Sequence, residues 1–142
     1  MRSLLVFLLL TITYALAYDP VFVDELEGLV INKNDEHELG MLDDDNNMIR
    51  SEKQKRLDVV LAKQPQLTKD RFRVVVERKK LLHQQKLNMR IANATDPKIK
   101  EFWEEIRRID DDMSISENGA DLKEFQLKSK LTPIQRLMLG DD

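Results

Sequence analysis

Four oxygen-bearing side chains in the C-terminal part of the chain have the spacing of a divalent-cation loop. Counted from Asp110, the first, third and fifth positions of a twelve-residue loop are Asp110, Asp112 and Ser114, and the twelfth is Asp121. Ca²⁺ and Mg²⁺ are hard cations that prefer such oxygen ligands. The sixth position is Ile115, however, where an EF-hand loop needs glycine for its sharp turn. The spacing therefore leaves two interpretations open: an open, hydrated site that binds Ca²⁺ or Mg²⁺ weakly, or a solvated acidic loop.

The other residues that could do chemistry give weaker signals. A second oxygen-rich run at residues 43–47 has Met48 and Gln54 at the sixth and twelfth positions, so we interpret it as a flexible polar linker. The chain has no cysteine, and its only histidines are His37 and His83, which excludes disulfides, thiolate sites and an ordinary structural zinc site. No Gly-x-Ser-x-Gly motif or phosphate-binding glycine loop is present. We expect a protein that is not an enzyme, with catalysis as a minor alternative.

Two further sequence features predict a glycosylation site and an anion-binding surface. Asn93 opens an Asn-Ala-Thr sequence that matches the acceptor pattern for glycosylation, and it falls at a predicted helix junction. Arg71, Arg73 and the basic run at residues 78–80 could bind a polyanion such as a glycosaminoglycan or a lipid headgroup, and we expect no nucleic acid. The alternative for these basic residues is a solvated helix face.

Helices must position these residues, and the strongest prediction is a core helix over residues 96–113. Asp96 or Thr95 can cap its first amides, and Pro97 suits the first helical position. Trp103 provides a large apolar anchor on its inner face. The apolar residues that share this face are Ile99, Phe102, Trp103, Ile106 and Met113, with Ile109 beside them. The helix therefore needs other helices to cover it.

The same reasoning predicts the remaining helices. One begins at a Ser51/Gln54 capping box and ends before Pro65, and a long one runs over residues 68–92, capped by Thr68. Another starts near residue 120, and a short one follows Pro133. The expected caps of these last two are Asn118 and Thr132, and the expected inward residues are Leu122 and Phe125. No internal repeat is visible. The prediction is an all-α fold: a small bundle of about four to five helices with an acidic, partly flexible N-terminal arm.

Charge and hydropathy divide the chain into three parts. Residues 1–17 have the basic start, apolar run and small-residue cleavage site of a secretory signal peptide. Residues 18–49 form the acidic arm, with ten acids against one lysine, and residues 50–139 form the helical domain, whose first part is strongly basic. The arm either lies against the basic helices or attracts a separate partner. No later apolar run has transmembrane length, so we expect a secreted, extracellular protein without a transmembrane anchor.

Two short motifs resemble a known family. Leu67-Thr68-Lys69 opens the long charged helix, and Met113-Ser114-Ile115-Ser116 is followed by a helix and by Leu131-Thr132-Pro133. Together these segments resemble the SXP/RAL family of secreted nematode proteins, over residues 57–138. That family includes parasite allergens and has a helical domain described as cation-binding. The resemblance implies a secreted, non-enzymatic protein that binds a divalent cation and interacts with the host or with another extracellular partner.

A second functional class stays open beside this one. A small helix bundle can carry a hydrophobic ligand such as a fatty acid or a retinoid in its interior. The residues expected to line such a pocket are Phe72, Val76, Phe102, Trp103 and Ile106. The alternative reading of these side chains is plain core. The partner is therefore a divalent cation, an unknown extracellular protein or polyanion, or a small apolar molecule.

Overall fold

The structure is a computed structural model that describes residues 18–140, and the predicted signal peptide at residues 1–17 lies outside this range. Residues 18–140 contain seven helices and one isolated antiparallel bridge between Ile49 and Ser116, which confirms the all-α prediction. The helices are α2 (Val23–Glu27), α3 (Lys33–Asp44), α4 (Arg50–Ala62), α5 (Gln66–Asn93), α6 (Pro97–Asp111), α7 (Glu117–Ser129) and α8 (Pro133–Met138). The predicted count of four to five was too low, because residues 33–44 of the acidic arm form α3, where we expected a flexible polar loop.

Most of the acidic arm is folded into α2 and α3, which corrects the prediction of a partly flexible arm; of the predicted linker at residues 43–47, Asp43 and Asp44 belong to α3. Asn32 caps α3 by accepting hydrogen bonds from the backbone amides of the next turn. Leu39 and Leu42, three residues apart on this helix, are both buried. Upstream, Val23 and Leu26 of α2 are fully buried as well. The arm forms helices because its few apolar residues recur on one face and find a core to enter.

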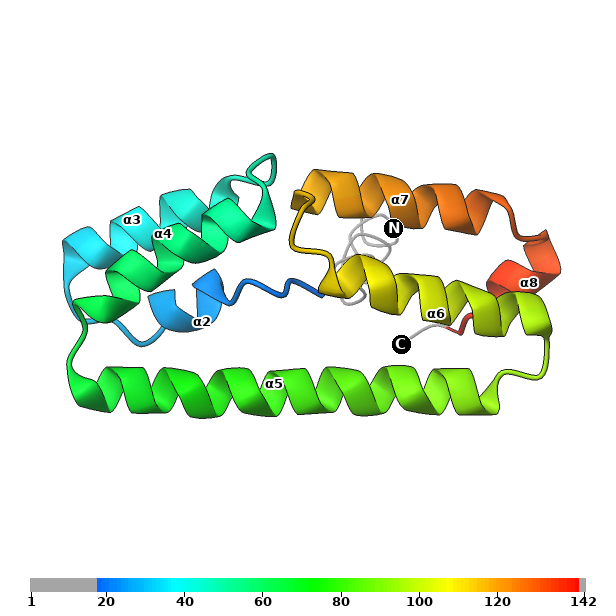
Figure 1. Cartoon of the computed structure of the whole chain (residues 1–142), viewed down its shortest axis with the longest axis horizontal. Helices are drawn as coiled ribbons and strands as arrows, with labels where there is room; N and C mark the ends of the chain where they lie inside the picture. Colours follow the sequence, from blue (N-terminus) through cyan, green and yellow to red (C-terminus); the bar gives the residue numbers. More distant parts are fainter. Residues whose placement is uncertain (1–17, 141–142) are drawn as a thin grey trace, which may run out of the picture.

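Two apolar clusters lie at opposite ends of the long helix α5. The first is built from the segment before α2, from α2, α3 and α4, and from Phe72 near the start of α5. The second joins Leu87, near the end of α5, to α6 and α7 and to the turn before α8. Figure 1 shows α5 along one whole edge of the molecule, with α2–α4 over one half and α6–α8 over the other. The helix ties the two halves of the fold together.

Two helix–loop–helix units meet through their loops, which corrects the prediction that the chain has no internal repeat. In the first unit α3 ends at Asp44 and α4 begins at Arg50; in the second α6 ends at Asp111 and α7 begins at Glu117. The corresponding positions are 67 residues apart. The units therefore have loops of the same length, and the Ile49–Ser116 bridge joins the last residues of the two loops.

Reciprocal backbone hydrogen bonds hold these loops together. Ser51 N donates to Met113 O at 2.9 Å, and at the equivalent positions Asn118 N donates to Asn46 O at 3.0 Å. A further bond runs from Arg50 N to Ile115 O at 2.9 Å. Each loop thereby satisfies backbone groups of the other, as short paired strands do.

The buried side chain of Arg50 links the two helix–loop–helix units. Its side chain is only 1% exposed, and its Nε lies 2.6 Å from Glu117 Oε1. Its Nη1 donates to the carbonyl oxygens of Ile109 (2.6 Å) and Asp112 (3.1 Å), close to the end of α6. Arg50 and Glu117 are the first residues of equivalent helices, so the repeat brings this pair together across the loops.

The predicted N-terminal capping residues were confirmed for two helices and were wrong for others. Asp96 caps α6 by accepting a hydrogen bond from Lys98 N, as predicted. Thr132 caps α8, also as predicted: its hydroxyl accepts from Gln135 N, and the Gln135 side chain accepts from Thr132 N in return. The proposed caps at Ser51 and Thr68 are wrong: neither α4 nor α5 has a side-chain cap, and both helices begin earlier.

Helix α7 also departs from its prediction. Its cap is Ser116, whose Oγ accepts from Gly119 N at 3.0 Å, so Asn118 lies inside the helix. Leu122 and Phe125 were expected to point inward, but they are 57% and 69% exposed. The helix buries Ala120 instead, because its partner α6 contacts the face that carries this small residue. No helix in residues 18–140 is long and apolar enough to cross a lipid bilayer.

Candidate functional site

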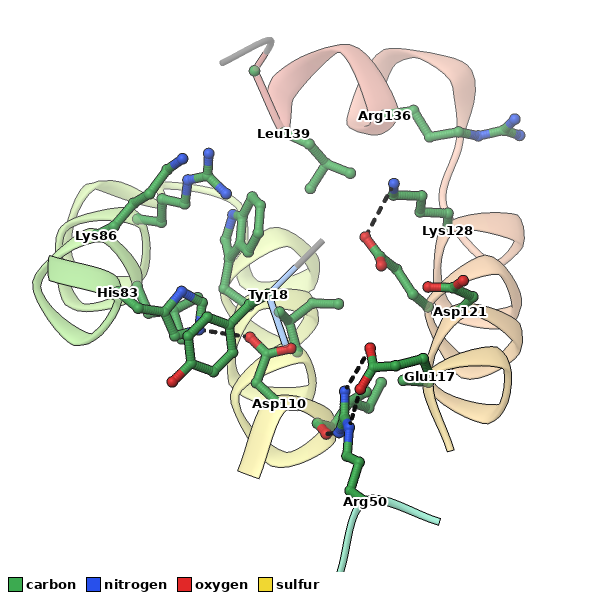
Figure 2. A pocket seen from close by; sticks show the side chains of 18 residues that line it. Tyr18, Arg50, His83, Lys86, Asp110, Glu117, Asp121, Lys128, Arg136 and Leu139 are labelled. Atoms are coloured by element: carbon green, nitrogen blue, oxygen red, sulfur yellow. Dashed lines mark hydrogen bonds and ion pairs between the residues drawn. The ribbon is translucent and has the colours of Figure 1, made fainter. Parts of the chain in front are cut away.

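A pocket of about 360 Å³ lies between the end of α5 and helices α6, α7 and α8. Figure 2 shows His83 and Lys86 of α5 on one side of the pocket and the carboxylates Glu117 and Asp121 of α7 on the other. The apolar part of the lining comprises Leu87, Trp103, Ile106, Ile109, Ala120 and Leu139. This volume lies within the range of pockets that hold small organic molecules.

Trp103 is the main feature of the apolar wall. It is 7% exposed, and its ring meets Phe102 edge-on with centroids 5.0 Å apart. The guanidinium of Arg90 lies 4.2 Å from the centre of the indole ring, within the range of a cation–π interaction. Both contacts restrict the ring, so the pocket has a preformed aromatic surface.

Three carboxylates of α7 form the opposite wall. Glu117, Asp121 and Glu124 follow one another at intervals of four and three residues, which places them on one helix face. Glu117 is paired with Arg50, and Glu124 lies 3.2 Å from Lys128. Asp121 forms no hydrogen bond or ion pair with another residue of the described range, and partial burial, with the charge of Glu117 adding to it, raises its pKa. Among residues 18–140 the wall therefore keeps one carboxylate without a hydrogen-bond or ion-pair partner, near the charge of Arg50.

A stacked pair of rings closes one corner of the pocket. The Tyr18 and His83 rings are nearly parallel, with centroids 3.7 Å apart, and His83 Nε2 lies 2.8 Å from Asp110 Oδ2. Burial, together with the nearby charges of Asp110 and Asp111, raises the pKa of the Tyr18 phenol to about 12. The fold places His83 on the inner side of α5 against the Asp110 carboxylate, with its side chain only 20% exposed.

The structure places the four predicted metal ligands in different surroundings. Asp110 is buried against His83, whereas Asp112 Oδ1 accepts bonds from the amide (2.9 Å) and hydroxyl (2.6 Å) of Ser114. These bonds lower the pKa of Asp112 and close the turn after α6. Asp121 lies on the pocket wall. The loop between α6 and α7 is also much shorter than a twelve-residue EF-hand loop, so its geometry differs from that template.

A different group of acids comes closer together. Among residues 18–140, Asp24, Glu27 and Asp43 are the three metal-ligating side chains whose oxygens all lie within 4.8 Å of one another. Burial raises the pKa of Asp43, and the charge of Asp24 adds to this effect. Asp43 belongs to the run that we interpreted as a linker. The acids of this group come from α2 and from the end of α3.

The glycosylation candidate and the predicted carrier pocket can also be located. Asn93 is the last residue of α5, and it and Thr95 are both exposed. Of the residues expected to line a carrier pocket, Trp103 and Ile106 do so. Phe72 and Val76 pack in the first cluster, at the other end of α5, so the predicted lining was partly wrong.

Sequence reasoning singled out Asp121 but missed Glu117 and Glu124 on the same wall of the pocket, although a signal for them was present. The spacing of Glu117, Asp121 and Glu124 marks one face of a helix, and the tetrapeptide at residues 42–45 (Leu-Asp-Asp-Asp) is matched by Ile-Asp-Asp-Asp at residues 109–112. That repeat would have predicted paired loops. No protein-family model, curated protein or solved structure matches this chain.

Proposed function

We propose that this protein is a non-enzymatic binding protein that holds a small amphipathic molecule in the pocket between α5 and α8. The observation that carries the proposal is the pocket itself, about 360 Å³, with Trp103 on one wall and three carboxylates of α7 on the other. An apolar body would lie on Trp103, Ile106 and Leu139, where it removes apolar surface from water. This function belongs to the carrier class.

The charge of the ligand follows from the wall that would face its polar end. Asp121 has no protein partner in the described range, and Glu117 beside it raises the pKa of Asp121 further. A cationic group placed there would interact favourably with both carboxylates. Lys86, Arg90 and Arg136 line other parts of the pocket. At the α7 wall itself the carboxylate of a fatty acid would be repelled, and we therefore favour an amine with an apolar tail.

Titration of the purified protein with a long-chain alkylamine tests the proposal, with Trp103 emission as the signal, because Trp103 is the single tryptophan. We expect a saturable change at micromolar ligand, and weaker binding of a fatty acid of equal length. Asp121→Asn should weaken binding of the amine roughly tenfold, as expected when one charged contact is lost. Asp111→Asn is the matched control, since Asp111 is exposed and does not line the pocket.

Each outcome is decisive for one part of the proposal. No saturable change with either ligand would remove the pocket function altogether. Tighter binding of the fatty acid, unaffected by Asp121→Asn, would keep the carrier and overturn the cationic group. Secretion, removal of residues 1–17 and membership of the SXP/RAL family stay predictions, and mass spectrometry of the natural protein would check the cleavage site.

Weak binding of Ca²⁺ or Mg²⁺ is a second candidate. The observation that favours it is the approach of Asp24, Glu27 and Asp43, whose repulsion a cation would relieve. At a site with a Kd of ~10⁻⁴–10⁻³ M, millimolar Ca²⁺ would stabilise the fold by roughly 1 kcal/mol. Thermal melts at matched ionic strength measure this shift. A shift that Asp43→Asn abolishes would assign the site to these acids, whereas no shift would remove the candidate.

A further inference from the structure

The outer face of α5 carries a stripe of large aliphatic residues. Its members, each between 54% and 64% exposed, are Leu67, Val74, Leu81, Leu82 and Met89. Arg71 and Arg78 lie between them, because residues three and four apart are neighbours on one helix face. We call these seven residues the outer stripe. Single exposed aliphatic residues are common, but here five share one face of one helix.

The outer stripe lies along a straight edge of the fold that no other helix of residues 18–140 covers. The opposite face of α5 is the one that enters the two clusters, through Phe72 and Leu87. Figure 1 shows every other helix on that same side of α5. From Leu67 to Met89 the stripe is about 33 Å long, at 1.5 Å per residue. A flat surface can therefore approach along its whole length.

The net positive charge of α5 favours an anionic partner. The helix contains eight basic residues against Asp70 and Glu77. On the inner side, Lys79 forms an ion pair with Glu25. Arg71 and Arg78, by contrast, form no hydrogen bond or ion pair with other residues of the described range. Their guanidinium groups are free to bind phosphate oxygens in pairs.

A second helix is a poor partner for this face. A coiled-coil seam would need apolar residues in alternating steps of four and three, and these positions include Arg71, Arg78 and Gln85. A second copy of the chain would also bring the same two arginines into proximity. We propose that the outer stripe docks on the surface of an anionic lipid bilayer, with its aliphatic side chains among the headgroups and its arginines on lipid phosphates.

Vesicle binding tests this docking surface. The purified protein should co-sediment with phosphatidylcholine vesicles that contain about one third phosphatidylserine, and roughly tenfold less with pure phosphatidylcholine. The double variants Leu81→Gln with Leu82→Gln and Arg71→Gln with Arg78→Gln should each weaken binding roughly tenfold. Leu122→Gln with Phe125→Gln is the matched control, since this pair on α7 is at least as exposed as Leu81 and Leu82. Circular dichroism melts would verify that each variant is folded.

A site-specific probe shows which face binds, because the chain has no cysteine. An environment-sensitive dye on Gln85→Cys should shift to the blue on anionic vesicles, and the same dye on Phe125→Cys should not. Absence of binding to anionic vesicles would overturn the proposal, as would a dye shift at residue 125 alone. If the arginine variant loses binding and the leucine variant keeps it, the helix binds a polyanion such as heparin, and the bilayer docking is wrong.

Discussion

Replacement of Arg50 tests whether the paired loops are held by a buried charge. Arg50→Met retains an unbranched, helix-compatible side chain but removes the guanidinium, which leaves Glu117 without its partner and the carbonyl oxygens of Ile109 and Asp112 without their side-chain donor. Removal of one member of a buried pair typically costs about 3–5 kcal/mol. Against a total stability of about 5–15 kcal/mol, this loss would be severe.

The size of the expected loss follows from the geometry around the guanidinium. Hydrogen bonds that involve a charged group contribute about 1.5–3 kcal/mol each, and Arg50 Nη1 donates two of them to carbonyl oxygens that water reaches poorly. Glu117 retains only 15% of its side-chain exposure, so the remaining carboxylate would be poorly solvated. We expect a loss of about 3 kcal/mol or more, measured by equilibrium unfolding in urea.

The control is an arginine in an exposed pair. Arg108 forms an ion pair with Glu105 one turn earlier, and its side chain is 69% exposed. Arg108→Met should change stability by less than about 0.5 kcal/mol. In a double-mutant cycle, Arg50→Met and Glu117→Gln should cost less together than the sum of their separate losses. If Arg50→Met lowers the free energy of unfolding by less than about 1 kcal/mol, Arg50 does not hold the two loops together.

Three further perturbations have defined outcomes. Burial raises the pKa of Asp19 to about 6. The protonated carboxyl therefore contributes stability at acid pH, and this contribution is lost as the pH rises through 6. The Asp19→Asn variant should be more stable than the parent by about 1–2 kcal/mol at pH 7 and equally stable at pH 4. Equal gains at the two pH values in urea titrations would contradict this. Ser116→Ala should cost about 1 kcal/mol because it removes the cap of α7, and an unchanged melting temperature would speak against it. Asn93→Gln should remove a glycan mass from protein secreted by eukaryotic cells; identical masses would show that the site is unused.

The sequence by itself determined the features that depend on neighbouring residues. Asp96 and Pro97 start α6 through contacts within one turn, and the 3.6-residue spacing around Trp103 identifies its buried face. The long helix was predicted within two residues of its observed bounds, Gln66–Asn93. Caps and backbone hydrogen bonds of a helix act over four residues or fewer, so a local pattern is sufficient to predict them.

Only the tertiary structure decided which helix faces are covered and which distant residues meet. Leu122 and Phe125 have the spacing of a core face, yet α7 turns Ala120 and Glu117 toward α6 and Arg50. Arg50 finds its partner 67 residues away, and the acidic arm is helical because α3 packs with α4 in the first cluster. Burial depends on the partner that packs against a face, and no pattern within one segment contains that information.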